Sequence, residues 1–248
     1  EAIPESRLVA LSDPDDENDD GISGRVQRIP TDTGLEVGRF GWKGDATTIE
    51  HQVAGAFAGD MGLTSSVIKT DDCTEAQTSC TDEPHGGEPE VDEVVFDRVV
   101  LYTSAVAVPA RRKASDPTIL EGKVLFRNIG CDDCHTPNHM TGPASIPEFE
   151  SQLIWPYTDL LLHDMGEALA DNRPVAEASG SEWKTPPLWG LGLVEAVNKH
   201  TRFLHDGRAR SLEEAILWHG GEAEASKVAF MDLSSQGRNA VLEFLGDL

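Results

Sequence analysis

Cys131, Cys134 and His135 form a Cys-x-x-Cys-His motif, in which two thiols stand three positions apart and a histidine follows directly. Thiols at this spacing can add to the two vinyl groups of a haem, and the histidine is then placed to bind the iron from below. A redox dithiol would not need the histidine, and a zinc site would need further ligands, of which His139 is the nearest. The motif therefore predicts one covalently attached c-type haem, with the dithiol and zinc as alternatives.

The other two cysteines, Cys73 and Cys80, lie in a polar stretch without a neighbouring histidine. Such a stretch suits a short-loop disulfide, and two free surface thiols are the alternative. Disulfides and attached haem both belong to compartments outside the cytosol. The cysteines together predict a periplasmic or extracellular protein.

The chain of 248 residues carries a formal net charge of −24. This charge would repel a phosphate backbone, which argues against a nucleic-acid partner, and it would attract a cationic redox protein. A saline habitat or solubility alone is the alternative reason for it. No apolar run approaches the ~18 residues of a membrane span, so no membrane span is expected.

The elements that must position the motif are predicted to be mainly helices joined by long connections. A Thr47-x-x-Glu50 pattern caps the first helix, and Ser211 caps the last, which ends at Trp218 and His219. The helix that ends at Ile129 leads into the Cys-x-x-Cys-His motif. Helices are expected over 47–58, 94–108, 117–129, 151–170 and 211–219, and loops over 12–34 and 70–92.

Two segments repeat at one constant offset along the chain. Two similar halves that each present a helix to a haem would produce such a repeat, and chance likeness between amphipathic helices is the alternative. The matched pairs are Phe40 with Phe203, Trp42 with His205, Gly44 with Gly207, Ala46 with Ala209, and Ile49 with Leu212.

Several segments resemble bacterial di-haem cytochrome c peroxidases and, most closely, the branch of that superfamily called di-haem oxidoreductases or thiol oxidoreductases. The resemblance runs nearly end to end. It implies a mainly α fold with a cytochrome c-like haem domain and long loops, forming the C-terminal part of a two-domain protein. Residues 1–113 would be the remainder of an N-terminal haem half, and 114–248 a C-terminal c-type cytochrome domain. The segments that carry it are 39–44, 60–62, 109–112, 156–166, 185–190, 203–215 and 219–223.

The same resemblance implies that His219, at the end of the last predicted helix, binds the iron opposite His135. Relatives often have methionine or tyrosine at this position. Gly220 and Gly221 would let the backbone behind His219 approach the macrocycle. Met165 is the alternative distal ligand, although a methionine on an apolar helix is more often a core residue.

Three residues match positions that relatives place between their two haems. Trp42 would relay electrons, Asp60 would act as acid and base on peroxide, and Gln52 would lie in the same pocket. The sequence departs from the peroxidase pattern, because Asp60 stands for a glutamate, the segment before it is two residues shorter, and Ala56 replaces a proline. These differences put peroxide chemistry in doubt. Composition alone predicts that Trp42 is a core aromatic residue and Asp60 a loop carboxylate.

Asp16, Asn18 and Asp20 place alternating oxygen donors before Gly21, as calcium loops do. Gln27 stands where a bidentate glutamate would be expected, so an EF-hand is not predicted. Similar loops recur in the resembled branch, and calcium is often held between the haem domains of the superfamily. A bound calcium ion is therefore a candidate, and a solvated acidic loop is the alternative.

The expected function is that of a c-type haem protein that passes electrons, as the electron-transfer half of a di-haem oxidoreductase. The alternative is a non-enzymatic cytochrome or an assembly subunit. Relatives attach a first haem at an earlier Cys-x-x-Cys-His motif, and this chain starts after that position. Peroxidase-like activity is therefore expected only together with an upstream haem domain, on the same chain or as a separate subunit.

Overall fold

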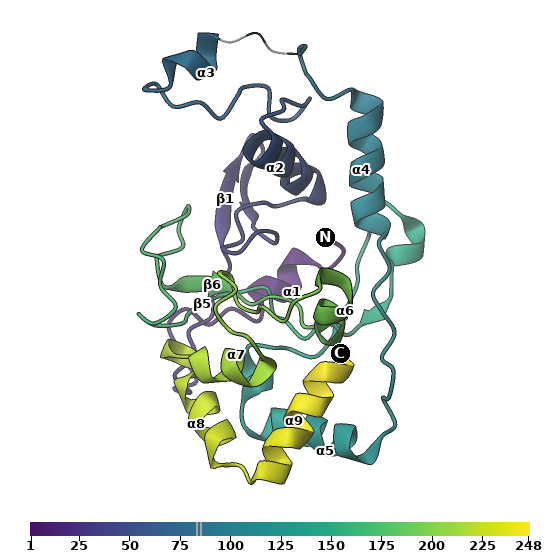
Figure 1. Ribbon diagram of the computed structural model, residues 1–248, viewed down its shortest axis with the longest axis vertical. Helices are drawn as coiled ribbons and strands as arrows, with labels where there is room; N and C mark the ends of the chain where they lie inside the picture. Colours follow the sequence, from purple (N-terminus) through teal and green to yellow (C-terminus); the bar gives the residue numbers. More distant parts are fainter. Residues whose placement is uncertain (83, 85) are drawn as a thin grey trace.

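The computed structural model describes residues 1–82, 84 and 86–248 (Figure 1). Within this described part, no helix is long and apolar enough to cross a membrane. The α-helices are α1 (Glu5–Val9), α2 (Ile49–Met61), α3 (Thr78–Asp82), α4 (Glu93–Ala105), α5 (Pro117–Asn128), α6 (Val194–Asn198), α7 (Leu212–Trp218), α8 (Glu224–Asp232) and α9 (Ser235–Asp247). Short 3-10 helices are η1 (Cys131–Asp133), η2 (Pro147–Phe149), η3 (Leu191–Leu193) and η4 (Gly221–Ala223).

The strands form small antiparallel pairs, so the fold is mostly helical with small sheets, as the sequence predicts. The pairs are β1 (Arg28–Thr31) with β2 (Gly34–Val37), β3 (His139–Met140) with β4 (Leu153–Ile154), and β5 (Leu162–Asp164) with β6 (Glu182–Lys184).

The main hydrophobic core lies around α5 and α9, at the bottom of Figure 1. The ring of Phe126 meets the rings of Phe244 and Tyr157 at centroid distances of 5.4 and 6.1 Å. A Cβ atom at Gly122 would lie 1.9 Å from the carbonyl oxygen of Ala240, so glycine is what lets the two helices approach. This packing fixes α5, whose C-terminal end leads into the Cys-x-x-Cys-His motif.

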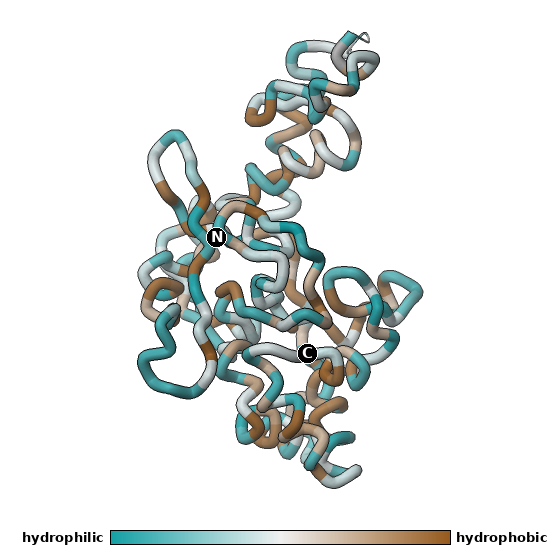
Figure 2. The backbone as a smooth tube through the Cα atoms, turned by 90° about the vertical axis from the view of Figure 1, so that its left-hand side faces the viewer, coloured by the Kyte–Doolittle hydropathy of each residue, from teal (hydrophilic) through white to brown (hydrophobic). Residues whose placement is uncertain are grey.

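A smaller core joins α2 and α4 near the top of Figure 1, where Phe57 and Phe96 meet. In Figure 2 this part extends upward from the rest of the chain as a narrower body. The segment before α2, in contrast, forms salt bridges with residues beyond 113. Examples are the pairs Arg25 with Glu182 and Lys43 with Asp171. The division into 1–113 and 114–248 remains a prediction.

The helix predicted over 151–170 is wrong. This stretch contains β4, an irregular connection and β5. Pro156 interrupts it, and Ser151, Tyr157 and Leu160 have positive φ angles of 53°, 54° and 61°, which a right-handed helix excludes. The apolar run 160–162 leads into the short strand β5, which begins at Leu162, and a run of that length does not distinguish a strand from a helix.

The other predicted elements are present, with shifted ends. The side chain of Thr48, not Thr47, caps α2 by accepting a hydrogen bond from the backbone N–H of His51 at 3.0 Å. Ser211 caps α7 as predicted. The two predicted loops are not free of regular structure, because 12–34 contains β1 and 70–92 contains α3.

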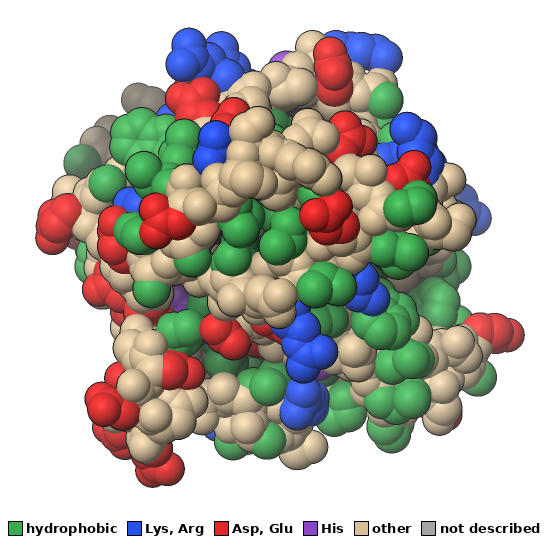
Figure 3. Space-filling model, turned by 90° about the horizontal axis from the view of Figure 1, so that it is seen from below, with side chains coloured by type: hydrophobic (Ala, Val, Ile, Leu, Met, Phe, Trp, Pro, Cys, Tyr) green, Lys and Arg blue, Asp and Glu red, His purple; other side chains and the backbone are tan. Residues whose placement is uncertain are grey.

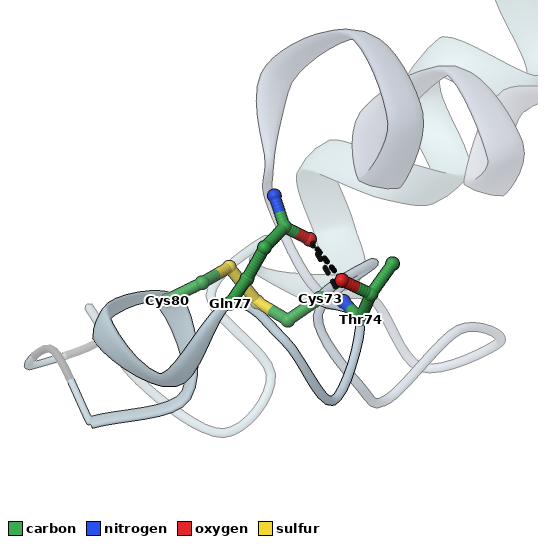
Figure 4. Close-up of a disulfide and its surroundings, with 4 residues drawn as sticks. All are labelled: Cys73, Thr74, Gln77 and Cys80. Atoms are coloured by element: carbon green, nitrogen blue, oxygen red, sulfur yellow. Dashed lines mark hydrogen bonds between the residues drawn. A yellow bond between two sulfur atoms is a disulfide. The ribbon is translucent and has the colours of Figure 1, made fainter.

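The predicted disulfide between Cys73 and Cys80 is confirmed (Figure 4). The side-chain oxygen of Gln77 accepts hydrogen bonds from the backbone and hydroxyl of Thr74 inside the loop, at 2.8 and 3.0 Å. A disulfide in an exposed polar loop suggests an oxidising compartment.

The repeated segments share a backbone conformation. Phe40 bridges to Ala46 and Phe203 bridges to Ala209, each pair in antiparallel orientation. The intervening Gly44 and Gly207 both have φ of 69°, and each segment leads into a helix with a hydroxyl cap. The sequence repeat is therefore a repeat of local structure. It places α2 and α7 in equivalent positions after their turns.

Candidate functional site

A cavity of about 340 Å³ lies beside the Cys-x-x-Cys-His motif. Cys131, Cys134, His135 and His219 all line it. Much of the remaining wall is apolar, as a site for a flat hydrophobic cofactor requires. This apolar part includes Phe126, Leu169, Leu188, Leu191, Leu212, Ile216, Val241 and Leu245.

The two motif thiols are not bonded to each other. Burial, together with the neighbouring Asp132, raises the pKa of Cys131 to about 12, and burial also raises the pKa of Cys134. A reactive dithiol needs the opposite shift, because the thiolate is the nucleophile. The raised pKa values of Cys131 and Cys134 therefore argue against a redox dithiol. They are compatible with cysteines that form thioether bonds.

His139, the further zinc ligand that the sequence suggests, is occupied elsewhere. It is buried, and its Nε2 donates a hydrogen bond to the carbonyl oxygen of Thr158 at 2.7 Å. Over residues 1–82, 84 and 86–248, no group of three or more His, Cys, Asp or Glu side chains is placed to hold a metal ion. The zinc alternative has no support from this arrangement.

His135 is oriented by the backbone. Its Nδ1 donates to the carbonyl oxygen of Tyr157 at 3.1 Å, and its ring packs against Phe126. Burial first, and then the nearby His219, lower the pKa of His135 to about 4. The ring is therefore neutral at pH 7, and its Nε2 is the nitrogen left for a metal. This is the form and orientation that an iron ligand needs.

His219 has the same arrangement at the end of α7. Its Nδ1 donates to the carbonyl oxygen of Ala215 at 2.7 Å, which leaves Nε2 for the cavity. Burial lowers the pKa of His219 too. Two neutral, backbone-oriented imidazoles thus line one apolar cavity beside two thiols, and this set of residues fits a haem c.

Met165, the alternative distal ligand, lines the same cavity from the turn after β5. A Cβ atom at Gly221 would lie 2.1 Å from the carbonyl oxygen of Asp164, and one at Gly220 would lie 3.1 Å from that of Met165. The contacts that require glycine are therefore with this turn, whereas the sequence pointed to the macrocycle. The close approach sets His219 and Met165 on adjoining segments.

A buried charged cluster lies behind Cys134. The ring of His163 donates from Nδ1 to Glu222 at 2.7 Å and from Nε2 to Asp159 at 2.9 Å. Burial opposes a charge on His163, but bonds to Asp159, Cys134 and Glu222 raise its pKa well above the usual value. Sequence reasoning missed this cluster. The only hint of this cluster in the sequence is that both segments that supply it, 156–166 and 219–223, carry the family resemblance.

Replacing His163 with Leu is expected to lower the free energy of unfolding by about 3–5 kcal/mol, because two buried carboxylates lose their shared cation. Denaturant unfolding of the haem-loaded protein at pH 7 measures this. The exposed His200 provides the control, since His200→Leu should change stability by less than ~0.5 kcal/mol. Equal unfolding midpoints for the two variants would contradict the role of the cluster.

The pH dependence of stability follows from the same cluster. The raised pKa of His163 stabilises the fold at low pH, and this is lost as pH rises through its folded value. Burial opposes the shift in Glu222, but the bond from His163 lowers its pKa, so its contribution is lost as pH falls through that lowered value. The cluster therefore contributes most between these limits, and His163→Leu should flatten the stability profile there.

The structure separates the three residues assigned to the region between two haems. Trp42 lines the cavity and is 55% exposed. Gln52 and Asp60 lie on α2, away from the cavity wall. The structure therefore brings only Trp42 to the candidate site, and the roles of all three remain predictions.

Trp183, which sequence reasoning missed, also lines the cavity. Its ring stacks on His205, the repeat partner of Trp42, with centroids 3.6 Å apart and planes 13° apart. The ammonium of Lys43 lies 4.4 Å from the centre of the Trp183 ring. Trp42, Trp183 and His205 all line the cavity, and we refer to these three residues as the aromatic group.

The loop carboxylates proposed for calcium are engaged with their own backbone. Asp16 accepts from the N–H groups of Asp20 and Gly21 at 3.0 and 3.1 Å, and Asp20 accepts from that of Ile22 at 2.8 Å. Asn18 donates to Asp20 at 2.9 Å. These bonds match the solvated-loop alternative, and calcium binding remains a prediction.

A chain of hydrazine synthase from Kuenenia stuttgartiensis, solved under xenon pressure, is similar with a TM-score of 0.39 and 20% sequence identity. The match covers 63% of this chain and 56% of that one, so it spans little more than half of the other chain. No curated protein matches. The family profile described as "Di-haem oxidoreductase, putative peroxidase" matches residues 1–248. Because this match covers the whole chain, the protein belongs to the di-haem oxidoreductase family.

Proposed function

We propose that this protein is a cytochrome c-like haem protein that passes electrons, as the C-terminal electron-transfer half of a di-haem oxidoreductase. The observation that carries the proposal is the pair of neutral histidines, His135 and His219, in one apolar cavity beside Cys131 and Cys134. The cysteines would hold the haem covalently, His135 would be the proximal ligand and His219 the distal ligand.

Haem iron supplies one-electron redox chemistry, and its axial ligands set the potential. The chain's own contribution is to hold both ligands still. Carbonyl oxygens of Tyr157 and Ala215 fix the two Nδ1 atoms, and this bond also makes each ring a better ligand. If His135 and His219 both bind the iron, a substrate would find no open position there, which would favour electron transfer over turnover at this site.

Electrons would enter or leave through the aromatic group. Trp42 is the exposed member of the group, and the stacked Trp183 and His205 are half-buried residues of the same cavity. Figure 3 shows acidic and basic side chains mixed on the face seen from below. The net charge of −24 supports a cationic redox partner. The disulfide and the thioether chemistry support a periplasmic or extracellular location.

A non-enzymatic electron-transfer or assembly role is the second candidate. It is favoured by the position of Gln52 and Asp60, which the structure keeps apart from the cavity. Peroxide chemistry, if the complete protein performs it, then belongs to a first haem that an upstream domain or a separate subunit would supply.

A preparation with one haem per chain is expected to exchange electrons with a small cationic redox protein and to give no turnover of hydrogen peroxide, since His135 and His219 would leave no open position at the iron. Haem counting by mass and by absorbance establishes the loading, and peroxide consumption is then followed with a reducing donor. Adding the upstream haem domain should restore turnover, and Asp60→Asn should then reduce it. Turnover by the one-haem preparation alone would reject the proposal and make this haem the reaction site.

A further inference from the structure

Glu222 lies in η4, shortly after His219 in the chain, and its carboxylate joins three separate segments. From β5, Nδ1 of His163 donates to Oε2 at 2.7 Å, and the N–H of Asp164 donates to Oε1 at 3.1 Å. From the N-terminal segment, the hydroxyl of Ser23 donates to Oε1 at 2.9 Å, and its N–H donates to Oε2 at 3.2 Å. We call these hydrogen bonds the Glu222 anchor.

The bonds of His219 itself stay within α7. Its Nδ1 and its N–H donate to the carbonyl oxygens of Ala215 and Ile216, which both belong to that helix. These bonds orient the ring on α7 but do not tie the end of the helix to β5. Two glycines follow His219 in the chain, and glycine has more conformational freedom to lose than any other residue. What lies beyond the glycines therefore decides whether this end of α7 stays in place.

The two glycines lie against the turn that carries Met165. A Cβ atom at Gly221 would lie 2.1 Å from the carbonyl oxygen of Asp164, and one at Gly166 would lie 3.0 Å from the nitrogen of Gly221. In the part of the chain that the structure describes, no backbone–backbone hydrogen bond joins these two segments. The bond from the N–H of Asp164 to Glu222 does join them. The Glu222 anchor therefore keeps the glycines against the turn.

The anchor is made by a buried charge. The side chain of Glu222 is 10% exposed. Burial raises its pKa, but the bonds from His163 and the other donors outweigh burial, and the pKa lies below its usual value. Glu222 is therefore an ionised acceptor at pH 7, and hydrogen bonds to ionised groups are stronger than those between neutral groups. Opening the anchor would leave a buried charge without partners, which is unfavourable.

We propose that Glu222 is a positioning residue that holds His219 at the haem iron. The inference rests on the proposed function, since it requires a haem in the cavity with His219 as its distal ligand. With the anchor in place, the glycines are held against the turn, and the end of α7 is fixed. Without the anchor, the glycines would regain their freedom, and His219 would leave the iron more easily.

The experiment is a spectral titration of the haem-loaded ferric protein with imidazole, a ligand that must displace His219. Glu222→Ala removes the whole anchor. It is expected to bind imidazole roughly 10-fold more tightly, because losing one hydrogen bond to a charged group shifts an equilibrium by about that factor. Its reduction potential should rise, since a loosened imidazole ligand favours ferric iron less. Ser23→Ala removes only the hydroxyl bond, so it should shift both quantities in the same direction by less.

Glu222→Gln tests whether hydrogen bonding, and not charge alone, holds the segment. Its amide oxygen can accept from Asp164 and Ser23, and its NH2 group can donate to a neutral His163. We therefore expect an imidazole affinity and a reduction potential close to the wild-type values. An imidazole affinity equal to that of Glu222→Ala would overturn the role of the anchor.

Two controls isolate the effect on His219. Glu224→Ala removes an exposed carboxylate that is paired with Lys227 at 2.6 Å, and it should leave the imidazole affinity unchanged. His219→Ala and the double variant His219→Ala/Glu222→Ala should bind imidazole equally, since no distal histidine remains to be held. A further increase in the double variant would overturn the inference, because Glu222 would then act on the cavity by another route.

The outcomes separate this inference from the proposed function. A wild type without covalent haem, or with an open iron, would defeat the proposed function itself. A six-coordinate wild type whose imidazole affinity equals that of haem-loaded Glu222→Ala would overturn the role of Glu222 alone. If Glu222→Ala does not fold, Ser23→Ala decides the question, and an unchanged imidazole affinity in that variant would overturn the inference.

Discussion

The double variant Cys131→Ala/Cys134→Ala is expected to contain no haem that survives denaturation, whereas the wild type keeps about one per chain. Both thiols line the cavity, and neither is engaged in a disulfide. Thioether bonds do not open in denaturant, so haem that remains with the unfolded wild-type chain must be covalently attached. Absorbance of the denatured chain after separation by size measures it.

The second cysteine pair provides the matched control. Cys73→Ser/Cys80→Ser removes the same number of sulfur atoms from a loop that does not line the cavity beside Cys131 and Cys134. This variant should keep its haem and lose only the stabilisation of a short disulfide loop, on the order of 2 kcal/mol. Equal haem loss in both double variants, or zinc in place of haem in the wild type, would reject the assignment of the motif.

The sequence could predict this motif and the helix before it because both depend on neighbours in the chain. α5 follows a capping aspartate, Asp116, and carries proline at its first position, and these local signals do not depend on the rest of the fold. The disulfide was predictable for the same reason, since Cys73 and Cys80 lie within one short loop. In 151–170 the local signal misled, because tertiary pairing with β6 decided the structure of a short apolar run.

The site beyond the motif depends on contacts between distant segments. Apolar residues precede His163 in the sequence. No nearby residue predicts that Glu222 will lie 2.7 Å from its ring in the folded chain. Such residues were out of reach because burial and charge environment are properties of the folded chain. His219 was reached only through the family resemblance.

His219→Ala is expected to open the iron to added ligands such as imidazole or azide, while Met165→Leu leaves the iron closed. If His219 is the distal ligand, an added ligand must displace it in the wild type. A displaced state a few kcal/mol higher in free energy is populated at ~0.1–10%. Removing His219 removes this penalty, so the apparent affinity should rise roughly 10- to 1,000-fold. Spectral titration of the ferric protein measures the change.

The same assignment predicts the colour and potential of the wild type. Imidazole favours ferric iron more than a thioether does, so the potential should be low and the methionine-to-iron absorption absent. The two variants test the two candidate ligands directly, because His219 and Met165 line one cavity from adjoining segments. Each variant therefore removes one candidate and leaves the other in reach. If Met165→Leu opens the iron and His219→Ala does not, the thioether is the ligand, and Ala215 then holds His219 as a wall residue only.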